Sequence, residues 1–275
     1  MAGPEDRALR LPSPLLAGIV ILLFLLSCAV APGLVAPYDP LAFDYGALQQ
    51  PPSGLHPFGT DQFGRDMLSR TIAAATIDLQ IALFATIVPL VVGTLIGLLV
   101  GYYGGWPDIV FGRLVDLVVT FPFLVLVIAI VAVLGPGLGN MYIAISVIGW
   151  VFYARLIRGE VLVLRGHDYV SAARVLGYSD GRILLRHILP NAARPVLVYW
   201  MTDMSLAILL GSSLGYLGLG AQPPAAEWGV LIADGKNLFT QAWWISVFPG
   251  FAIVLCGVGF SLVGDGLADL LDVKR

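Results

Sequence analysis

The chain has 275 residues, of which 58% are hydrophobic and only 12% are charged, and its formal net charge is −3. Soluble domains carry about 25% charged and about 45–50% apolar residues, so this composition excludes an ordinary soluble domain. Long apolar runs recur along the chain, which predicts an all-α protein that crosses a membrane several times. The sequence has no basic tract with interleaved aromatic residues, so we expect no nucleic-acid partner.

The polar residues 1–14 lead into an apolar run at about residues 15–35. An A-x-A triplet at residues 29–31 would fit the cleavage site of a signal peptide. Against cleavage, Pro32 would follow the cut, and the run is long enough to cross a hydrocarbon core of about 30 Å. We therefore expect an uncleaved first membrane span.

Residues 36–77 are polar and rich in Pro, Gly and Asp, so we expect a loop outside the membrane. Gly59 and Gly64 suit turns in this loop. Asp66 could pair with Arg70 across one turn of a helix.

Four side chains of this loop allow two interpretations. Thr60 and Asp61 could cap a helix. Alternatively, His56, Asp61 and Asp66 could be metal ligands. The cap and salt-bridge interpretation is favoured, and we expect no metal site.

Five further apolar runs follow, and we expect each to form a membrane span. Pro89 and Pro122 lie inside two of them. Pro89 could kink its helix, because neighbouring helices can satisfy the freed carbonyl group. Tyr and Trp side chains at residues 102–108 suit a turn at the membrane interface. The expected spans cover about residues 79–101, 117–134, 141–156, 195–219 and 244–263.

The polar segment 158–194 separates the fourth and fifth expected spans. Its spacing of apolar residues at i, i+3, i+4 and i+7 predicts one face of a short helix. Asp168 suits the start of this helix, and Gly177 suits a left-handed cap after its last turn. The predicted face consists of Tyr169, Ala172, Ala173 and Leu176.

Ser179 could cap a second short helix, which Pro190 would end at about Leu189. A helix–Gly–helix unit of this size cannot bury its own apolar surface. Its Ala-rich stripe is therefore expected to dock into a groove on another protein.

Ser171-Ala172-Ala173, Gly177 and the run HILP at 187–190 resemble the EAA loop of ABC importer permeases. Ser171 replaces the family's Glu, and His187 stands where Ile is expected; both departures are common in the dipeptide/oligopeptide/nickel branch. By this resemblance, segment 158–194 forms the coupling helices that dock onto an ATPase subunit. The implied coupling residues are Tyr169, Ser171, Ala172, Ala173, Leu176, Gly177 and Pro190. An ordinary cytoplasmic loop of another membrane protein is the alternative.

Other segments resemble the same branch more specifically. The run HPFGTDQFGRDMLSR at 56–70 agrees with it at about ten fixed positions, and LGLGAQPPAAEWG at 217–229 and GDGLADLLD at 264–272 resemble its later motifs. The extracytoplasmic motif residues carried over are Gly59, Thr60, Asp61, Gly64, Arg65 and Asp66.

The resemblance implies a type I importer permease fold over residues 15–275, with about six transmembrane helices. The implied partners are a homologous second permease, two cytosolic ATPase subunits, an extracytoplasmic solute-binding protein and the lipid bilayer. The chain would form half of the pathway for a peptide-like solute, with nickel-chelate or opine-type substrates as alternatives.

The distribution of Lys and Arg predicts the orientation, because acidic residues contribute little to topology. Six spans place twelve of these residues on the side of the termini and three on the other side. We therefore expect both termini and segment 158–194 in the cytoplasm, loop 36–77 outside, and a bacterial or archaeal cytoplasmic membrane as the location.

The sequence has no G-x-x-x-x-G-K-[ST] phosphate loop, so we expect no enzyme and no cofactor in this chain, with ATP and Mg on the partner subunits. Asp203 lies inside the fifth expected span, where a carboxylate is costly and faces the bundle interior, a partner or water. It could contact solute in the pathway or be structural. Asp203 also supports two competing classes: an ion-driven secondary transporter, or an intramembrane enzyme that uses it with Asp116.

Overall fold

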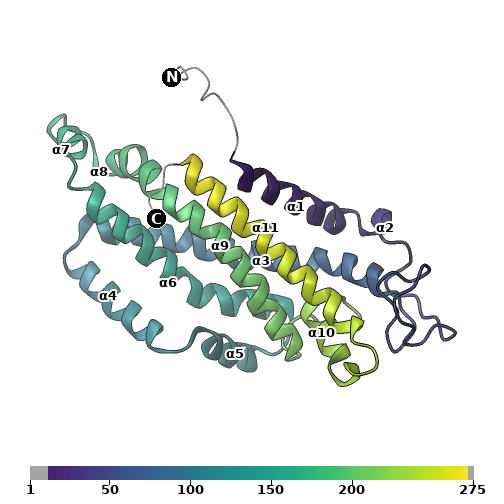
Figure 1. Ribbon diagram of the computed structural model, residues 1–275. Coiled ribbons are helices and arrows are strands. Elements are labelled where there is room, and N and C mark those ends of the chain that lie inside the picture. Colours follow the sequence, from purple (N-terminus) through teal and green to yellow (C-terminus); the bar gives the residue numbers. More distant parts are fainter. Residues whose placement is uncertain (1–11, 272–275) are drawn as a thin grey trace, which may run out of the picture.

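The computed structural model describes residues 12–271, and it confirms an all-α fold in that part of the chain (Figure 1). The expected cytoplasmic residues 1–11 and the end of the tail motif, 272–275, lie outside the described residues. The helices are α1 Ser13–Val30, α2 Pro32–Val35, α3 Met67–Tyr103, α4 Gly105–Thr120, α5 Phe123–Leu134, α6 Leu138–Leu164, α7 Asp168–Val175, α8 Asp180–Ile183, α9 Leu189–Tyr216, α10 Trp228–Gly235 and α11 Trp244–Leu270.

Helix α3 is the longest helix, with 37 residues, and it runs through the middle of the bundle (Figure 1). It begins at the cap Asp66, whose carboxylate accepts the Ser69 backbone N–H at 2.8 Å. Residues 67–77 were expected in the loop but are helical, because their polar side chains lie on buried faces of α3. The helix continues through Pro89 and ends at Gly104, which has φ +64°.

Glycines bring the long helices into close contact. A methyl group added at Gly93 would lie 2.3 Å from the Trp150 carbonyl oxygen, and one at Gly97 would lie 2.2 Å from the Ala154 carbonyl oxygen. The two glycines are four residues apart, so they form a small-x-x-x-small seam between α3 and α6. Helix α1 packs along α11 in the same manner.

The third expected span is not one continuous helix. Helices α4 and α5 meet at an angle of 85° around Phe121 and Pro122. Phe121 has ψ 142°, which is the extended conformation that a residue before proline prefers. The proline therefore breaks this segment, which the sequence had predicted as one span containing Pro122.

The number of membrane spans remains a prediction. By length and apolar composition, four helices of the described chain can cross a membrane, or up to five if the bent pair α4–α5 counts as one span. The expected span at 141–156 lies in α6, which has 27 residues but also carries Arg155 and Arg158.

The loops gather at two opposite ends of the bundle (Figure 1). Helices α7 and α8 lie at one end. The loop that precedes α3 and the short helix α10 lie together at the other end. The long helices between them separate the two groups of motif residues that the sequence identifies.

Candidate functional site

The predicted helix of segment 158–194 is confirmed as α7, and its two sides differ sharply in exposure. Val170 and Ala173 are buried, at 0% and 4% exposure, in a cluster formed with α3, α6 and α9. Tyr169 and Leu176 are exposed, at 39% and 71%. Ala173 was expected on the docking face, and this was wrong: it faces the chain's own core, while Tyr169, Ala172 and Leu176 face outward.

Gly177 ends helix α7 as expected, with φ +78°. The Tyr178 N–H donates to the Ala173 carbonyl at 3.1 Å, and the Gly177 N–H donates to the Arg174 carbonyl at 2.9 Å. These two bonds form a Schellman-type cap, which favours glycine because the left-handed conformation strains residues with a Cβ. Ser179 occupies the cap position of α8, but its side chain makes no cap hydrogen bond.

Helices α7 and α8 are fixed to the end of α3. The Tyr102 hydroxyl donates to Asp180 at 2.6 Å, and the Arg174 guanidinium lies 5.3 Å from the Tyr102 ring centre. The Arg165 side chain donates to the Gly101 carbonyl at 2.9 Å. Helices α7 and α8 are therefore held by contacts within the chain, and the outer face of α7 stays exposed.

Pro190 does not end the second helix. Residues Leu184–Ile188 form a π-turn, in which the Leu189 N–H donates to the Leu184 carbonyl, and α9 continues directly through Pro190. The wider turn accommodates a proline that cannot donate an N–H. The predicted stop is thus a junction inside one long helical segment, Asp180–Tyr216.

At the other end, Asp61 organises the loop before α3. Its carboxylate accepts a hydrogen bond from Arg65 Nε at 2.7 Å and from Arg70 at 2.7 Å, and also the backbone N–H groups of Phe63 and Arg65. The expected pair of Asp66 with Arg70 is wrong, because Arg70 bonds to Asp61 instead. The salt-bridge interpretation holds with a different partner, but the predicted cap is wrong, because Asp66 rather than Thr60 or Asp61 caps α3.

Asp66 caps α3 and also bonds to the His56 ring at 2.9 Å. Gly59 and Gly64 have φ +71° and +76°, as turns require. Thr60 accepts a hydrogen bond from the Gln50 N–H at 2.8 Å and helps to close the loop. Among residues 12–271, no group of three His, Cys, Asp or Glu side chains is arranged to hold a metal ion.

Asp234 on α10 faces the same two arginines. Its carboxylate lies 3.6 Å from Arg70 and 3.9 Å from Arg65. Burial raises the pKa of Asp234, and the Arg65 charge opposes that rise. The extracytoplasmic motif thus ties the loop before α3 to α10, a connection that the sequence did not predict.

Asp203 lines a cavity of about 300 Å³ between α3, α5, α6 and α9. The Tyr153 hydroxyl donates to one Asp203 oxygen at 2.6 Å, and the Tyr199 ring packs edge-on against Tyr153. In the described chain, no Lys or Arg forms an ion pair with Asp203. The remaining walls are mostly apolar, formed by residues that include Pro89, Phe123 and Phe152.

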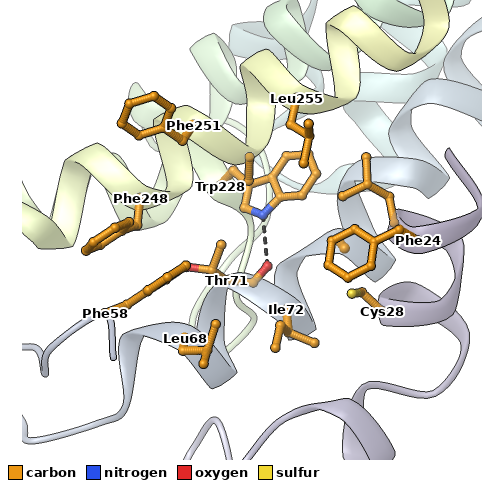
Figure 2. A pocket seen from close by; sticks show the side chains of 13 residues that line it. Phe24, Cys28, Phe58, Leu68, Thr71, Ile72, Trp228, Phe248, Phe251 and Leu255 are labelled. Atoms are coloured by element: carbon orange, nitrogen blue, oxygen red, sulfur yellow. Dashed lines mark hydrogen bonds between the residues drawn. The ribbon is translucent and has the colours of Figure 1, made fainter. Parts of the chain in front are cut away.

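A second cavity, of about 380 Å³, lies between α1, α3, α10 and α11 (Figure 2). Phe24 and Cys28 of α1 face Phe251 and Leu255 of α11 across it. Figure 2 also shows the Trp228 indole between them, with Nε1 donating to the Thr71 carbonyl at 3.0 Å.

The sequence analysis missed two polar contacts. Arg158 forms a two-pronged ion pair with Asp108 that joins α6 to α4, and Asp108 lies in the first turn of α4, where the sequence predicted a turn at the membrane interface. Asp78 and Glu227 are fully buried near each other. Asp78 directly precedes the expected span at 79–101, and an ionisable residue flanked by apolar residues at the edge of a span is the signal that could have identified it.

Known proteins resemble the chain over most of its length. The family described as "Binding-protein-dependent transport system inner membrane component" matches residues 93–275. The Probable D,D-dipeptide transport system permease protein DdpC of Escherichia coli (strain K12) is 42% identical over 96% of this chain and 88% of its own. The glutathione transport system permease protein GsiD of Pectobacterium atrosepticum is 39% identical over 98% and 89%.

A third relative extends the match to nearly the full length of both proteins. The di/tripeptide transport system permease protein DppC of Pseudomonas aeruginosa is 39% identical over 99% of this chain and 96% of its own. The chain therefore belongs to the family of binding-protein-dependent transport system inner membrane components, the permease subunits of ABC importers.

Proposed function

We propose that α7 and α8 are the coupling helices of this permease and receive the movement of a cytosolic ATPase subunit. The observation that carries the proposal is the apolar outer face of α7, formed by Tyr169, Val175 and Leu176, of which Val175 is 88% exposed. Monomeric soluble surfaces rarely leave such a helix face uncovered, and a groove on a partner would cover it. Gly177 and the contacts of Tyr102 hold the helix in place while it transmits force.

The proposed assembly contains a homologous second permease, two ATPase subunits that hold ATP and Mg, and an extracytoplasmic solute-binding protein. Family membership and the names of the relatives support it. The basic residues support an orientation with α7 in the cytoplasm and the loop before α3 outside.

We infer a peptide-like solute. The relatives are named for D,D-dipeptide, glutathione and di/tripeptide transport, all of them short peptides. Asp203 supports the inference from the structure, since it supplies a carboxyl group, with no cationic partner in the described chain, to the wall of a cavity inside the bundle. Such a group suits the cationic amino terminus of a peptide.

The coupling role is tested by Leu176→Asp in the complex expressed with its partner subunits. Because Leu176 is 71% exposed, the change leaves the fold intact but places a charge in the proposed interface. We expect membrane insertion at the wild-type level and at least a tenfold loss of ATPase co-purification, which corresponds to about 1.4 kcal/mol or more.

The matched control is Leu55→Asp, the same change at a leucine that is 74% exposed at the opposite end of the molecule. It should leave ATPase co-purification unchanged. Normal co-purification with Leu176→Asp would show that α7 is an ordinary connector.

A further inference from the structure

Two buried carboxyl groups lie outside every site described above. Asp78, in α3, and Glu227, just before α10, are both 0% exposed, and their side chains form a hydrogen bond with each other. They are 149 positions apart in the sequence (227 − 78), so only the tertiary fold brings them together.

The pair connects three helices. Both Glu227 oxygens accept backbone N–H groups at the start of α10, from Gly229 at 2.7 Å and from Val230 at 3.0 Å. One Asp78 oxygen accepts the Trp228 N–H at 3.0 Å, and the Ser212 hydroxyl of α9 donates to the other at 3.3 Å. The Trp228 contact ties the beginning of α10 to α3, the Ser212 contact ties α9 to α3, and the two Glu227 contacts cap α10.

No positive charge balances this pair within residues 12–271, where neither carboxyl group forms an ion pair with Lys, Arg or His. The neighbouring titratable groups on which the Asp78 charge acts are Tyr142 of α6 and Cys256 of α11, and neither can carry a positive charge. Two carboxylates in contact at such a site cannot both be ionised, so they must share a proton.

The hydrogen bonds indicate which carboxyl keeps the charge. Glu227 is the cap of α10, where two N–H donors and the positive end of the helix dipole stabilise a carboxylate. Each carboxylate oxygen can accept two hydrogen bonds, so an ionised Glu227 can still accept one from Asp78, whose own carboxyl group receives only one backbone N–H. Asp78 bonds to Ser212 through a longer contact and can direct a proton toward Glu227.

We propose that Asp78 is a neutral carboxylic acid that donates to an ionised Glu227, and that this shared proton fixes α10 to α3 and α9. The two side chains are positioning residues for transport.

The surrounding packing leaves little freedom for another arrangement. A methyl group added at Gly215 would lie 1.9 Å from a Glu227 oxygen, and one at Gly229 would lie 1.9 Å from the Ser212 carbonyl oxygen. The Trp228 indole is anchored on the Thr71 carbonyl and lies in the wall of the apolar cavity (Figure 2), while the Trp228 backbone N–H donates to Asp78. Atoms of the described chain therefore enclose the Asp78 and Glu227 side chains and exclude solvent from them.

The test compares Asp78→Asn with Glu227→Gln in the complex purified with its partner subunits. Asn keeps one acceptor for the Trp228 N–H and supplies an N–H donor to Glu227, so the melting temperature should stay within about 2 °C of wild type. Gln replaces one acceptor with a donor and leaves a buried backbone N–H of α10 without a partner. It should lower the melting temperature by at least about 4 °C.

An infrared spectrum detects the protonation state of the carboxyl groups directly, which a measurement of stability alone does not. At neutral pH the wild type should show the carbonyl stretch of a protonated carboxylic acid, and the band should disappear in Asp78→Asn. Asp116→Asn, at an exposed carboxyl of α4, is the control and should change neither measurement.

Two results for the melting temperature would overturn the proposal: equal destabilisation by the two amide variants, or greater destabilisation by Asp78→Asn. A wild-type infrared spectrum without the band assigned to Asp78 would also overturn it. None of these measurements requires that the solute be a peptide. A failure here is therefore distinct from a failure of the proposed function, which uptake by the wild-type complex tests.

Discussion

At the scale of single residues, the Asp61 carboxylate accepts four hydrogen bonds at once, from the backbone N–H groups of Phe63 and Arg65 and from the side chains of Arg65 and Arg70. Asp61 and Arg70 are almost fully buried, with side-chain exposures of 1% and 2%, and Arg65 also bonds to Asp61. Removing one partner of a buried ion pair costs about 3–5 kcal/mol, because the remaining charge stays buried without compensation. The buried contacts of Asp61 therefore account for Asp61, Arg65 and Arg70 as structural residues of the loop.

Asp203 can be tested by removing its charge while its shape is kept. In Asp203→Asn, the amide oxygen can still accept the Tyr153 hydroxyl, so the bundle should assemble normally. If the carboxylate binds a cationic amino terminus, uptake of radiolabelled dialanine by the reconstituted complex should fall about tenfold or more. A hydrogen bond to a charged group contributes about 1.5–3 kcal/mol.

Tyr153→Phe is the matched control, since it removes the hydrogen bond and leaves the carboxylate. Its effect on uptake should be clearly smaller than that of Asp203→Asn. If both variants transport normally, Asp203 is a structural residue of the α6–α9 contact.

At the scale of elements, the seam between α3 and α6 depends on glycine at positions where backbones touch. Gly97→Ala places a methyl group 2.2 Å from the Ala154 carbonyl oxygen, so the helices must separate. Overpacking of this kind costs about 1–3 kcal/mol. We expect a melting temperature lowered by several degrees in detergent or nanodiscs.

The control is Gly257→Ala in α11, where an added methyl group meets nothing within 4 Å. There the better helix propensity of alanine should leave stability unchanged or raise it by up to about 1 kcal/mol. Equal stability of the two variants would mean that the α3–α6 seam is not tightly packed.

Helix α7 shows why an element of eight residues needs its neighbours. A helix this short is not stable alone, because few hydrogen bonds offset the ordering of its backbone. Val170 and Ala173 bury its inner face, and Tyr102 contacts both Arg174 and Asp180 from the end of α3. The outer face then remains available to a partner.

At the scale of the whole molecule, the two groups of motif residues lie at opposite ends of the bundle (Figure 1). Cysteines introduced at Gln50 and Gly166, both exposed, test the orientation in a background that lacks Cys28 and Cys256. An impermeant maleimide should label Gln50→Cys in intact cells and leave Gly166→Cys unlabelled, because basic residues favour the cytoplasmic side.

Permeabilised cells provide the control, in which both cysteines should react. Labelling of both positions from outside intact cells would contradict the six-span orientation. It would also remove α7 from the reach of a cytosolic ATPase.

The amino-acid sequence by itself determined the features that depend on local or summed properties. Apolar runs predicted a helical membrane protein, and fixed motif spacings predicted the family. The i, i+3, i+4 pattern predicted α7, and the need for a left-handed residue predicted the conformation of Gly177. These features follow from backbone sterics and hydrophobicity, which each segment carries with it.

Only the tertiary structure decided which side chains meet. Periodicity placed Ala173 on a stripe, but packing against α3 and α6 turned it inward. Arg70 bonds to Asp61 rather than Asp66, and Asp78 meets a carboxyl group from the other half of the chain. Such contacts depend on how long helices are oriented against one another, and that orientation minimises the combined energy of packing and buried charge, which no single segment determines.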